Sequence, residues 1–163
     1  MRSLRTLALT VVLTGCGFQL RGTSDLPFES VYVAGTGSLV LDLKRSIRSG
    51  SRTQVVEDPK AAQAVLEFTQ ESRQKDILSL SAAGRVREFR LLYRVGFRVH
   101  DGKGGEFLPG STLQLARDIT FSDADVLAKE TEEQLLYRDM QTDIVRQIMR
   151  RLAEAKTPKP PAR

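Results

Sequence analysis

Residues 85–100 carry the clearest hydrophobic pattern of the chain. Charged or polar residues alternate there with an apolar set: Phe89, Leu91, Tyr93, Val95, Phe97 and Val99. A repeat of two is typical of a β-strand with one buried face. At about 3.3 Å per residue such a strand spans roughly 50 Å, so the pattern predicts an unusually long strand.

A glycine-rich turn and a second alternating segment follow this strand. Residues 101–105 are typical of a hairpin loop. After them the apolar residues Leu113, Leu115, Ile119 and Phe121 alternate with mostly polar neighbours, which predicts an antiparallel return strand. Shorter strands are expected at residues 31–33, 54–56, 62–70 and 77–80.

Two segments have the spacing of amphipathic helices. In the first, apolar residues at positions 39, 43 and 47 follow Ser38, whose hydroxyl is expected to cap the helix. In the second, Thr131 and Gln134 resemble a capping box. The apolar stripe after them is Tyr137, Met140, Ile144, Ile148 and Leu152. Because each helix needs an apolar surface to cover, we predict an α+β fold, a two-layer sandwich with two helices packed on one face of the sheet.

The first 16 residues have the organisation of an export signal. Two arginines precede an uncharged apolar run at residues 7–13, which is far shorter than the roughly 20 residues of a membrane-spanning helix. The run ends in Leu13-Thr14-Gly15-Cys16, which resembles a lipoprotein cleavage site. We expect a signal peptide at residues 1–15 and covalent lipid on Cys16, as S-diacylglycerol and N-palmitoyl groups. The alternative is an ordinary secretory signal with an incidental cysteine.

The lipid and the residue after it set the expected location. Two or more acyl chains hold a protein firmly in a bilayer, whereas one chain holds it marginally. Gly17 follows the cysteine where an Asp would mark retention in the inner membrane, so we expect the outer membrane, with the anchor in its periplasmic-side leaflet. Residues 16–27 are then a lipidated tether, residues 28–155 a single α+β domain, and residues 156–163 a disordered Pro-rich tail.

The basic composition of the whole chain is misleading. The chain has 25 basic and 20 acidic residues, a net charge of +5. Five of those 25 basic residues lie in the leader and the tail, so residues 16–155 hold 20 of each sign. A neutral, exported domain argues against a nucleic-acid partner.

Groups typical of catalysis or of a metal site are scarce in this sequence. His100 is the single histidine, and its position at a strand end favours a solvated surface residue. Glu130, Glu132 and Glu133 are better interpreted as favourable charges near a helix N-terminus than as metal ligands. With the single cysteine acylated, we predict no enzymatic activity, no cofactor and no metal, against the alternative of a periplasmic hydrolase.

The long strand is also rich in arginine, with the row Arg85, Arg87, Arg90, Arg94 and Arg98. Such a row keeps a sheet face soluble and discourages edge pairing. It equally suits an anion site, because arginine forks bind phosphate well. The residues leave both interpretations open. In an outer-membrane lipoprotein, the abundant phosphorylated partner is lipopolysaccharide.

Several stretches, in the same order, resemble the LptE family of lipopolysaccharide-assembly lipoproteins. The start of the mature chain resembles the family's start at Cys16-Gly17-Phe18-Gln19-Leu20-Arg21-Gly22. The middle hairpin is matched by Gly84-Arg85-Val86-Arg87-Glu88-Phe89. The C-terminal part is matched by Val126-Leu127-Ala128-Lys129-Glu130 and Gln147-Ile148-Met149-Arg150-Arg151-Leu152. No single motif is diagnostic, but the ordered set is specific and extends over residues 16–153.

The resemblance implies two helices on a mostly antiparallel four-stranded sheet. It implies a place inside LptD, the outer-membrane β-barrel of the lipopolysaccharide translocon, as a plug and assembly factor. It also implies lipopolysaccharide binding through basic residues that match Arg85, Arg87 and Lys129. Where family members have a further basic residue before the glycine, this chain has Ala82-Ala83. The competing interpretation is a lipoprotein subunit of another envelope assembly or lipid-transport complex.

Overall fold

The computed structural model describes residues 25–122 and 124–156. The signal peptide, Cys16 and most of the expected tether lie outside the described residues, as does most of the expected tail. What the sequence predicts for those segments stays a prediction.

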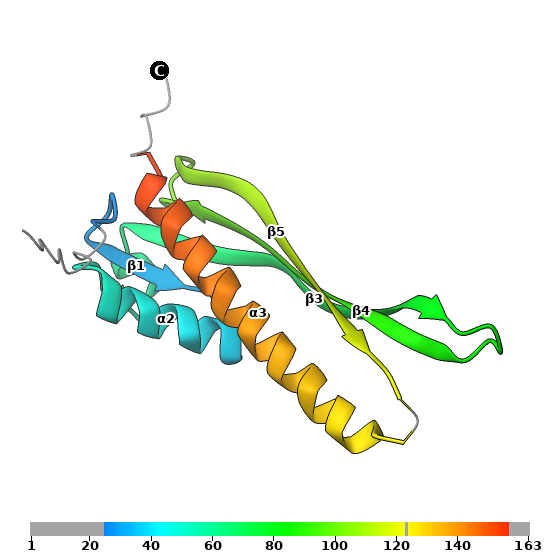
Figure 1. Cartoon of the computed structure of the whole chain (residues 1–163). Coiled ribbons are helices and arrows are strands. Elements are labelled where there is room, and N and C mark those ends of the chain that lie inside the picture. The colour runs from blue at the N-terminus through cyan, green and yellow to red at the C-terminus, as the bar shows by residue number, and fades with distance from the viewer. Residues whose placement is uncertain (1–24, 123, 157–163) are drawn as a thin grey trace, which may run out of the picture.

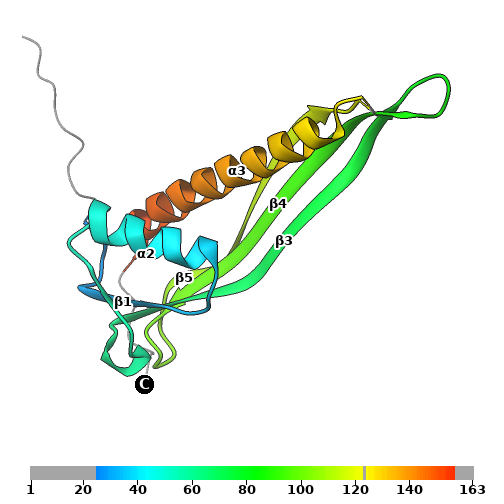
Figure 2. The ribbon, with the colours of Figure 1, turned by 90° about the horizontal axis from the view of Figure 1, so that it is seen from below.

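The described chain forms a sheet of five strands, two α-helices and a short 3₁₀ helix (Figure 1). Their order is β1 (Ser30–Val33), α2 (Ser38–Gly50), β2 (Gln54–Val56), η2 (Pro59–Ala61), β3 (Ala64–Leu80), β4 (Val86–His100), β5 (Glu106–Thr120) and α3 (Val126–Glu154). Both α-helices cover the same side of the sheet, and the β3–β4 hairpin extends beyond them (Figure 2). The predicted two-layer α+β architecture is confirmed.

The sheet differs from the expectation in strand number and in direction. Its order is β2-β1-β3-β4-β5; β1 is parallel to both β2 and β3, whereas the β3–β4 and β4–β5 pairs are antiparallel. The expected four-stranded, mostly antiparallel sheet is therefore wrong, because the sheet is five-stranded and mixed. Parallel neighbours cannot be joined by a tight turn and need a crossover connection, which α2 supplies between β1 and β2.

The long strand predicted from alternation is β4. Its outward residues include Arg90 and Arg98, which are exposed. Its inward residues are fully buried: Leu91, Tyr93, Val95, Phe97 and Val99. One face of β4 therefore belongs to the core and the other to the outer surface of the sheet.

Residues 62–70 and 77–80, expected as two strands, belong to one strand of 17 residues, β3. Its middle is polar and has no clear alternation, so the sequence pattern breaks there. Pairing with β4 nevertheless runs from Val65–His100 to Leu80–Val86, with register shifts near both ends of β3. The middle of β3 is therefore a strand because it pairs with β4, whose alternation is clear, and its own sequence pattern does not define it.

Both helices begin elsewhere than expected. Gly37 is the cap residue of α2, and the Ser38 hydroxyl instead donates to the Gln141 side-chain oxygen, 3.0 Å away. Helix α3 begins at Val126, and the Thr131 hydroxyl inside it donates to the carbonyl of Leu127. The predicted cap at Ser38 is wrong, because its hydroxyl binds Gln141 on α3. The predicted cap at Thr131 is wrong as well, because α3 already begins at Val126 and Thr131 lies inside the helix.

One hydrophobic core joins the two layers. Ile144, Ile148 and Leu152 of α3 are fully buried in the same cluster as the inward face of β4. Leu43 and Ile47 of α2 belong to that cluster as well. The predicted apolar faces of both helices are confirmed.

The described chain begins at the end of the sheet opposite the β3–β4 turn. Asp25 forms an ion pair with Arg52, and Phe28 packs edge-on against Phe107 near the start of β5. The 15 residues of β4 separate this end from the turn. At about 3.3 Å per residue, the two ends lie roughly 50 Å apart.

Candidate functional site

The last residues of β5 and the first turns of α3 lie beside the β3–β4 hairpin at one end of the molecule, which we call the hairpin end, and the turn of the hairpin extends beyond them (Figure 2). The Phe121 N–H donates to the carbonyl of Arg87 at 2.7 Å, which holds the chain after β5 against the start of β4. The Lys129 ammonium donates to the Thr120 hydroxyl at 3.0 Å, which holds α3 against the end of β5. These bonds bring together residues from three elements.

The turn that leads into β4 depends on Gly84. This glycine has a φ of +75°, a left-handed conformation that side chains other than glycine rarely adopt. Its N–H donates to the carbonyl of Ser81 at 2.9 Å, and the Ser81 N–H donates to the carbonyl of Arg85 at 2.7 Å. The turn therefore fixes the position of Arg85, and through it the start of β4, where Arg87 lies.

Arg87 and Lys129 line two adjoining hollows at the hairpin end. Arg87 contributes to a hollow of about 420 Å³, and Lys129 to a second one of about 260 Å³. Thr120 and Phe121 line both hollows. The structure therefore brings Arg87 and Lys129 to either side of one short segment, with Arg85 two residues before Arg87.

The two cations are held differently. The Lys129 ammonium donates to Glu132 at 2.9 Å as well as to Thr120, and it does not pair with the neighbouring Glu130. Among the described residues, no hydrogen bond or ion pair engages the guanidinium of Arg87, which is exposed. Arg87 is thus a cation whose five donors remain available to an anion.

The other three arginines of the row lie on the outer face of the sheet and are each engaged by a neighbour. Arg90 forms two hydrogen bonds with Asp118, at 2.8 and 2.9 Å, which lower the pKa of the Asp118 carboxyl. Two donors of Arg94 bind the side-chain oxygen of Gln114, and two of Arg98 bind Glu67. The arginine row therefore divides: these three stabilise a solvated sheet face, and Arg85 and Arg87 belong to the hairpin end.

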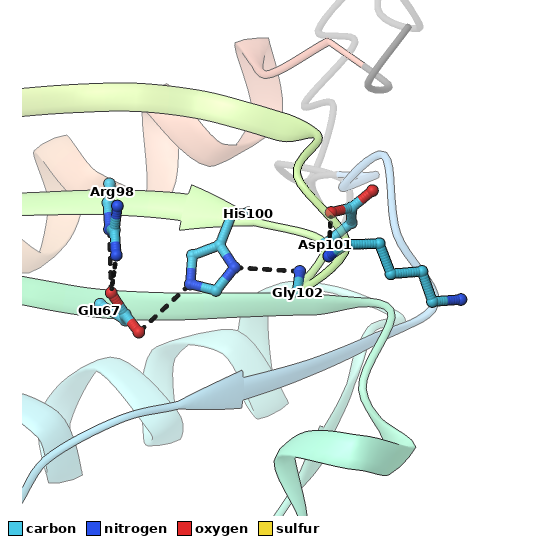
Figure 3. Close-up of polar contacts among 6 residues, drawn as sticks. Glu67, Arg98, His100, Asp101 and Gly102 are labelled. Carbon is cyan, nitrogen blue, oxygen red and sulfur yellow. Dashed lines mark hydrogen bonds and ion pairs between the residues drawn. The ribbon is translucent and has the colours of Figure 1, made fainter. Parts of the chain in front are cut away.

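His100 has a structural role in the β4–β5 loop (Figure 3). Its Nδ1 accepts from the Gly102 N–H at 3.0 Å, and its Nε2 lies 3.3 Å from a Glu67 carboxylate oxygen. Arg98, and to a smaller extent His100, hold the pKa of Glu67 below its usual range. The interpretation of His100 as a solvated strand-end residue is wrong, because the imidazole is half-buried and joins the loop to β3.

Two of the three glutamates at the start of α3 are partners of lysines. Glu132 accepts from Lys129, and Glu133 accepts from Lys75 on β3. Over residues 25–122 and 124–156, no group of three or more His, Cys, Asp or Glu side chains is placed to hold a metal ion. Within the same ranges, none of the helices has the length and apolar character needed to cross a membrane.

Sequence reasoning missed the apolar side chains of the hairpin end. Ile77 and Leu80 on β3 are more than half exposed, and Leu127 on the first turn of α3 is 79% exposed. The signal was present as Val126 and Leu127 within an otherwise polar connection. Exposed apolar side chains next to cations are typical of a contact surface rather than of a solvated end.

Fold and site together define an elongated two-layer α+β protein that presents basic and apolar side chains at one end. A family model described as "LptE: Lipopolysaccharide-assembly" matches residues 28–152. The chain therefore belongs to the LptE family of lipopolysaccharide-assembly lipoproteins, which are not enzymes. The resemblance found in the sequence is confirmed.

Curated relatives and solved structures agree with this family. The LPS-assembly lipoprotein LptE of Photorhabdus laumondii is 30% identical over 154 residues, which cover 90% of this chain and 82% of that protein. The solution structure of lipoprotein B from Nitrosomonas europaea is 42% identical, with a TM-score of 0.73 over 84% of this chain and 90% of that one. The crystal structure of rare lipoprotein B from Shewanella oneidensis is 25% identical, with a TM-score of 0.66 over 77% and 94%.

Proposed function

We propose that this chain is the outer-membrane lipoprotein of a lipopolysaccharide transport machine. It plugs the lumen of the β-barrel LptD, assists the assembly of that barrel, and binds lipopolysaccharide during delivery to the cell surface. Family membership supports the role in lipopolysaccharide assembly. The observation that carries the ligand role is the available guanidinium of Arg87, with Lys129 lining the adjoining hollow.

The outer face of the sheet suits a place inside a barrel. The lumen of an outer-membrane barrel is polar, so a plug needs a polar surface with charges of both signs. On this face Arg90 is paired with Asp118 and Arg98 with Glu67. These pairs make the surface hydrophilic and each balances its own charges, which is compatible with a polar lumen wall.

The anchor of this proposal lies far from the ligand site. Nine peptide steps separate Cys16 from Asp25, where the described chain begins. Fully extended, those steps reach roughly 30 Å. An acylated Cys16 therefore holds the molecule by the end opposite the hairpin end, and binding of lipopolysaccharide there does not compete with the anchor for the same surface.

The ligand contacts follow from the chemistry of phosphate. Arginine binds phosphate through two parallel charge-assisted hydrogen bonds, and lysine adds a point charge. Arg87 and Lys129 flank the segment Thr120–Phe121, and Arg85 adds a third cation two residues before Arg87. We assign the phosphates of lipopolysaccharide to these three residues.

Reversing the charges tests this assignment. The double variant Arg87→Glu with Lys129→Glu should bind lipopolysaccharide at least about tenfold more weakly, since two charge-assisted contacts are lost. The difference should shrink as salt rises, because exposed ionic contacts are screened over about 8 Å at physiological ionic strength. The control is Lys103→Glu with Arg150→Glu, which makes the same change in net charge away from the hairpin end. Equal affinities of the two double variants, at low and high salt, would remove the phosphate assignment.

The partner is tested separately. Affinity purification of the full chain from membranes should recover one outer-membrane β-barrel protein in a stable complex. The control is the same preparation from cells without the tagged chain. Recovery of a different envelope complex, with no such barrel, would contradict the plug role.

A further inference from the structure

The smaller hollow of the hairpin end has an apolar floor. It lies between β4, the end of β5 and the start of α3, with a volume of about 260 Å³. Phe89 and Phe121 meet edge-to-face there at 5.3 Å, and Ile119 beside them is 5% exposed. Two aromatic rings and a branched side chain thus form the bottom of a hollow that is open to solvent.

The apolar surface continues from this floor to the outside. Ile77 is the register partner of Phe89, so the two side chains share one face of the β3–β4 pair, and Ile77 is 58% exposed. Val126 lines the hollow from the first turn of α3 and is 40% exposed. Exposed apolar side chains therefore flank the floor on two sides, with Ile77 beside Phe89 on the sheet and Val126 on α3.

Charges at the rim are balanced. Lys75 lies 4.4 Å from the centre of the Phe89 ring and is paired with Glu133, while Lys129 is paired with Glu132. Glu130 also lines the rim. An anionic group is therefore not drawn into this hollow itself. It is drawn to Arg87, which lines the adjoining hollow that shares Thr120 and Phe121 with this one.

This division selects the occupant. A volume of about 260 Å³ lies below the roughly 300–1,000 Å³ of pockets that enclose whole small ligands. An α-helix, roughly 10 Å across, is too bulky for it. A single unbranched hydrocarbon chain is slender and matches an apolar floor. An anionic head on the same molecule then reaches Arg87.

We propose that the smaller hollow is an acyl-chain subsite, and that it takes one acyl chain of the amphiphile whose phosphate lies at Arg87 in the adjoining hollow. This subsite rests on the proposed function for the identity of the amphiphile. Burial of each methylene in it contributes about a fourfold gain in affinity. The hairpin end thus binds lipopolysaccharide at the junction of its acylated and phosphorylated parts.

Photo-crosslinking in the full chain tests the subsite directly. Val126→p-benzoylphenylalanine places the reactive group at the hollow, and Leu41→p-benzoylphenylalanine places it at another exposed apolar position, on α2. After irradiation of intact membranes, the position 126 variant should yield a lipopolysaccharide adduct whose crosslink maps, by mass spectrometry, to an acyl chain. The position 41 variant should yield none. A crosslink from position 126 that maps to the sugar overturns the subsite and leaves the phosphate assignment in place.

A blocking variant gives a second measurement. Val126→Trp fills the mouth of the hollow and should weaken lipopolysaccharide binding about tenfold, the equivalent of about two methylenes withdrawn. Binding of fully deacylated lipopolysaccharide, which keeps its phosphates, should stay unchanged in the same variant. Leu41→Trp is the control. Unchanged affinity of Val126→Trp for the acylated form, with a normal circular dichroism spectrum, overturns the subsite. If the double variant Arg87→Glu with Lys129→Glu binds the deacylated form with wild-type affinity, the proposed phosphate contacts are overturned instead.

Discussion

Arg73 and Gln141, which are 68 residues apart, are joined by a hydrogen bond of 3.0 Å from the guanidinium to the side-chain oxygen. The same oxygen accepts from the Ser38 hydroxyl, and the Gln141 amide donates to Asp42 at 2.7 Å. The Arg73 guanidinium also lies over the ring of Tyr93, 4.9 Å from its centre. One buried glutamine therefore joins α2, α3 and β3.

Loss of this junction should cost stability. Gln141→Leu removes the buried acceptor of two part-buried hydrogen bonds, from Arg73 and Ser38, and one of these donors is charged, so we expect a loss of about 1–3 kcal/mol in the free energy of unfolding. Urea denaturation measures it. The control is Gln114→Leu, which removes an acceptor of Arg94 on the exposed sheet face and should change stability by less than about 0.5 kcal/mol. Equal losses in the two variants would show that burial of the junction contributes nothing.

The core face of α3 is tested by a buried charge. Ile144 is fully buried against the sheet, so Ile144→Asp places an unpaired carboxylate in the core and should prevent cooperative unfolding or remove most of the stability. Leu135→Asp, on the same helix at a half-exposed position, should be nearly neutral. Thermal unfolding followed by circular dichroism compares them. Wild-type stability of Ile144→Asp is the result that contradicts the assigned face.

Glu67 should contribute a pH-dependent stability. Its pKa is lowered, first by Arg98 and then by His100, so its contribution is present above the unfolded-state pKa and is lost as pH falls through the folded-state pKa. Glu67→Gln should therefore be less stable than the wild type at pH 7, by under about 1 kcal/mol for so exposed a group. The difference should shrink as pH falls below the usual glutamate pKa of about 4.3 and vanish below the lowered folded-state pKa. Urea denaturation over a series of pH values measures it. The control is Glu154→Gln, which makes the same change of side chain at the exposed end of α3.

The anchor is tested at Cys16. Cys16→Ala removes the thiol that takes the diacylglycerol, so labelling with radioactive palmitate should disappear and the precursor should keep residues 1–15. Gel mobility and labelling report both effects. Undiminished labelling of the variant would show that the lipid is attached elsewhere or not through this signal.

The parts of the fold that the sequence predicts are those in which a side-chain period dominates. Alternation in β4 and the apolar stripe of α3 each define a buried face, because a slip of one residue would expose that face to water. Local signals failed where tertiary contacts decide. Ser38 binds Gln141 instead of capping its own helix, and α3 starts before Thr131 because Val126 and Lys129 pack against the end of β5.

The candidate site divides in the same way. Residue type and spacing indicated a basic strand. The role of each arginine depends on its hydrogen-bond partner, and a partner on another strand cannot be identified from the sequence pattern of one strand. Asp118 engages Arg90 and Glu67 engages Arg98, while the guanidinium of Arg87 has no such partner among the described residues. The apolar hollow beside Lys129 depends on three elements meeting, so its existence could not be predicted from any one of them.

The side chain of Thr69 on β3 lies close to the backbone of Gly96, in the middle of β4. A β-carbon on this residue would lie 2.6 Å from the Thr69 hydroxyl oxygen, well inside contact distance. Thr69 lies where the β3–β4 register shifts, between the pairs Phe68–Phe97 and Gln70–Gly96. The glycine is therefore required by the irregularity in the neighbouring strand rather than by its own backbone angles.

This close approach predicts a coupling between the two positions. Gly96→Ala should destabilise the protein by about 1–3 kcal/mol, because Thr69 is β-branched and held in a strand, with little freedom to move away. Thr69→Ala removes the offending oxygen, so the double variant should recover most of that loss and give a coupling energy of at least about 1 kcal/mol in a double-mutant cycle. Urea denaturation of the four proteins measures it. A loss that persists in the double variant would show that the Thr69 hydroxyl is not its cause, since the next nearest atoms, in Gln70, lie at ordinary contact distances of 3.4 and 3.5 Å. A neutral Gly96→Ala would show that β3 relaxes at its register shift without cost.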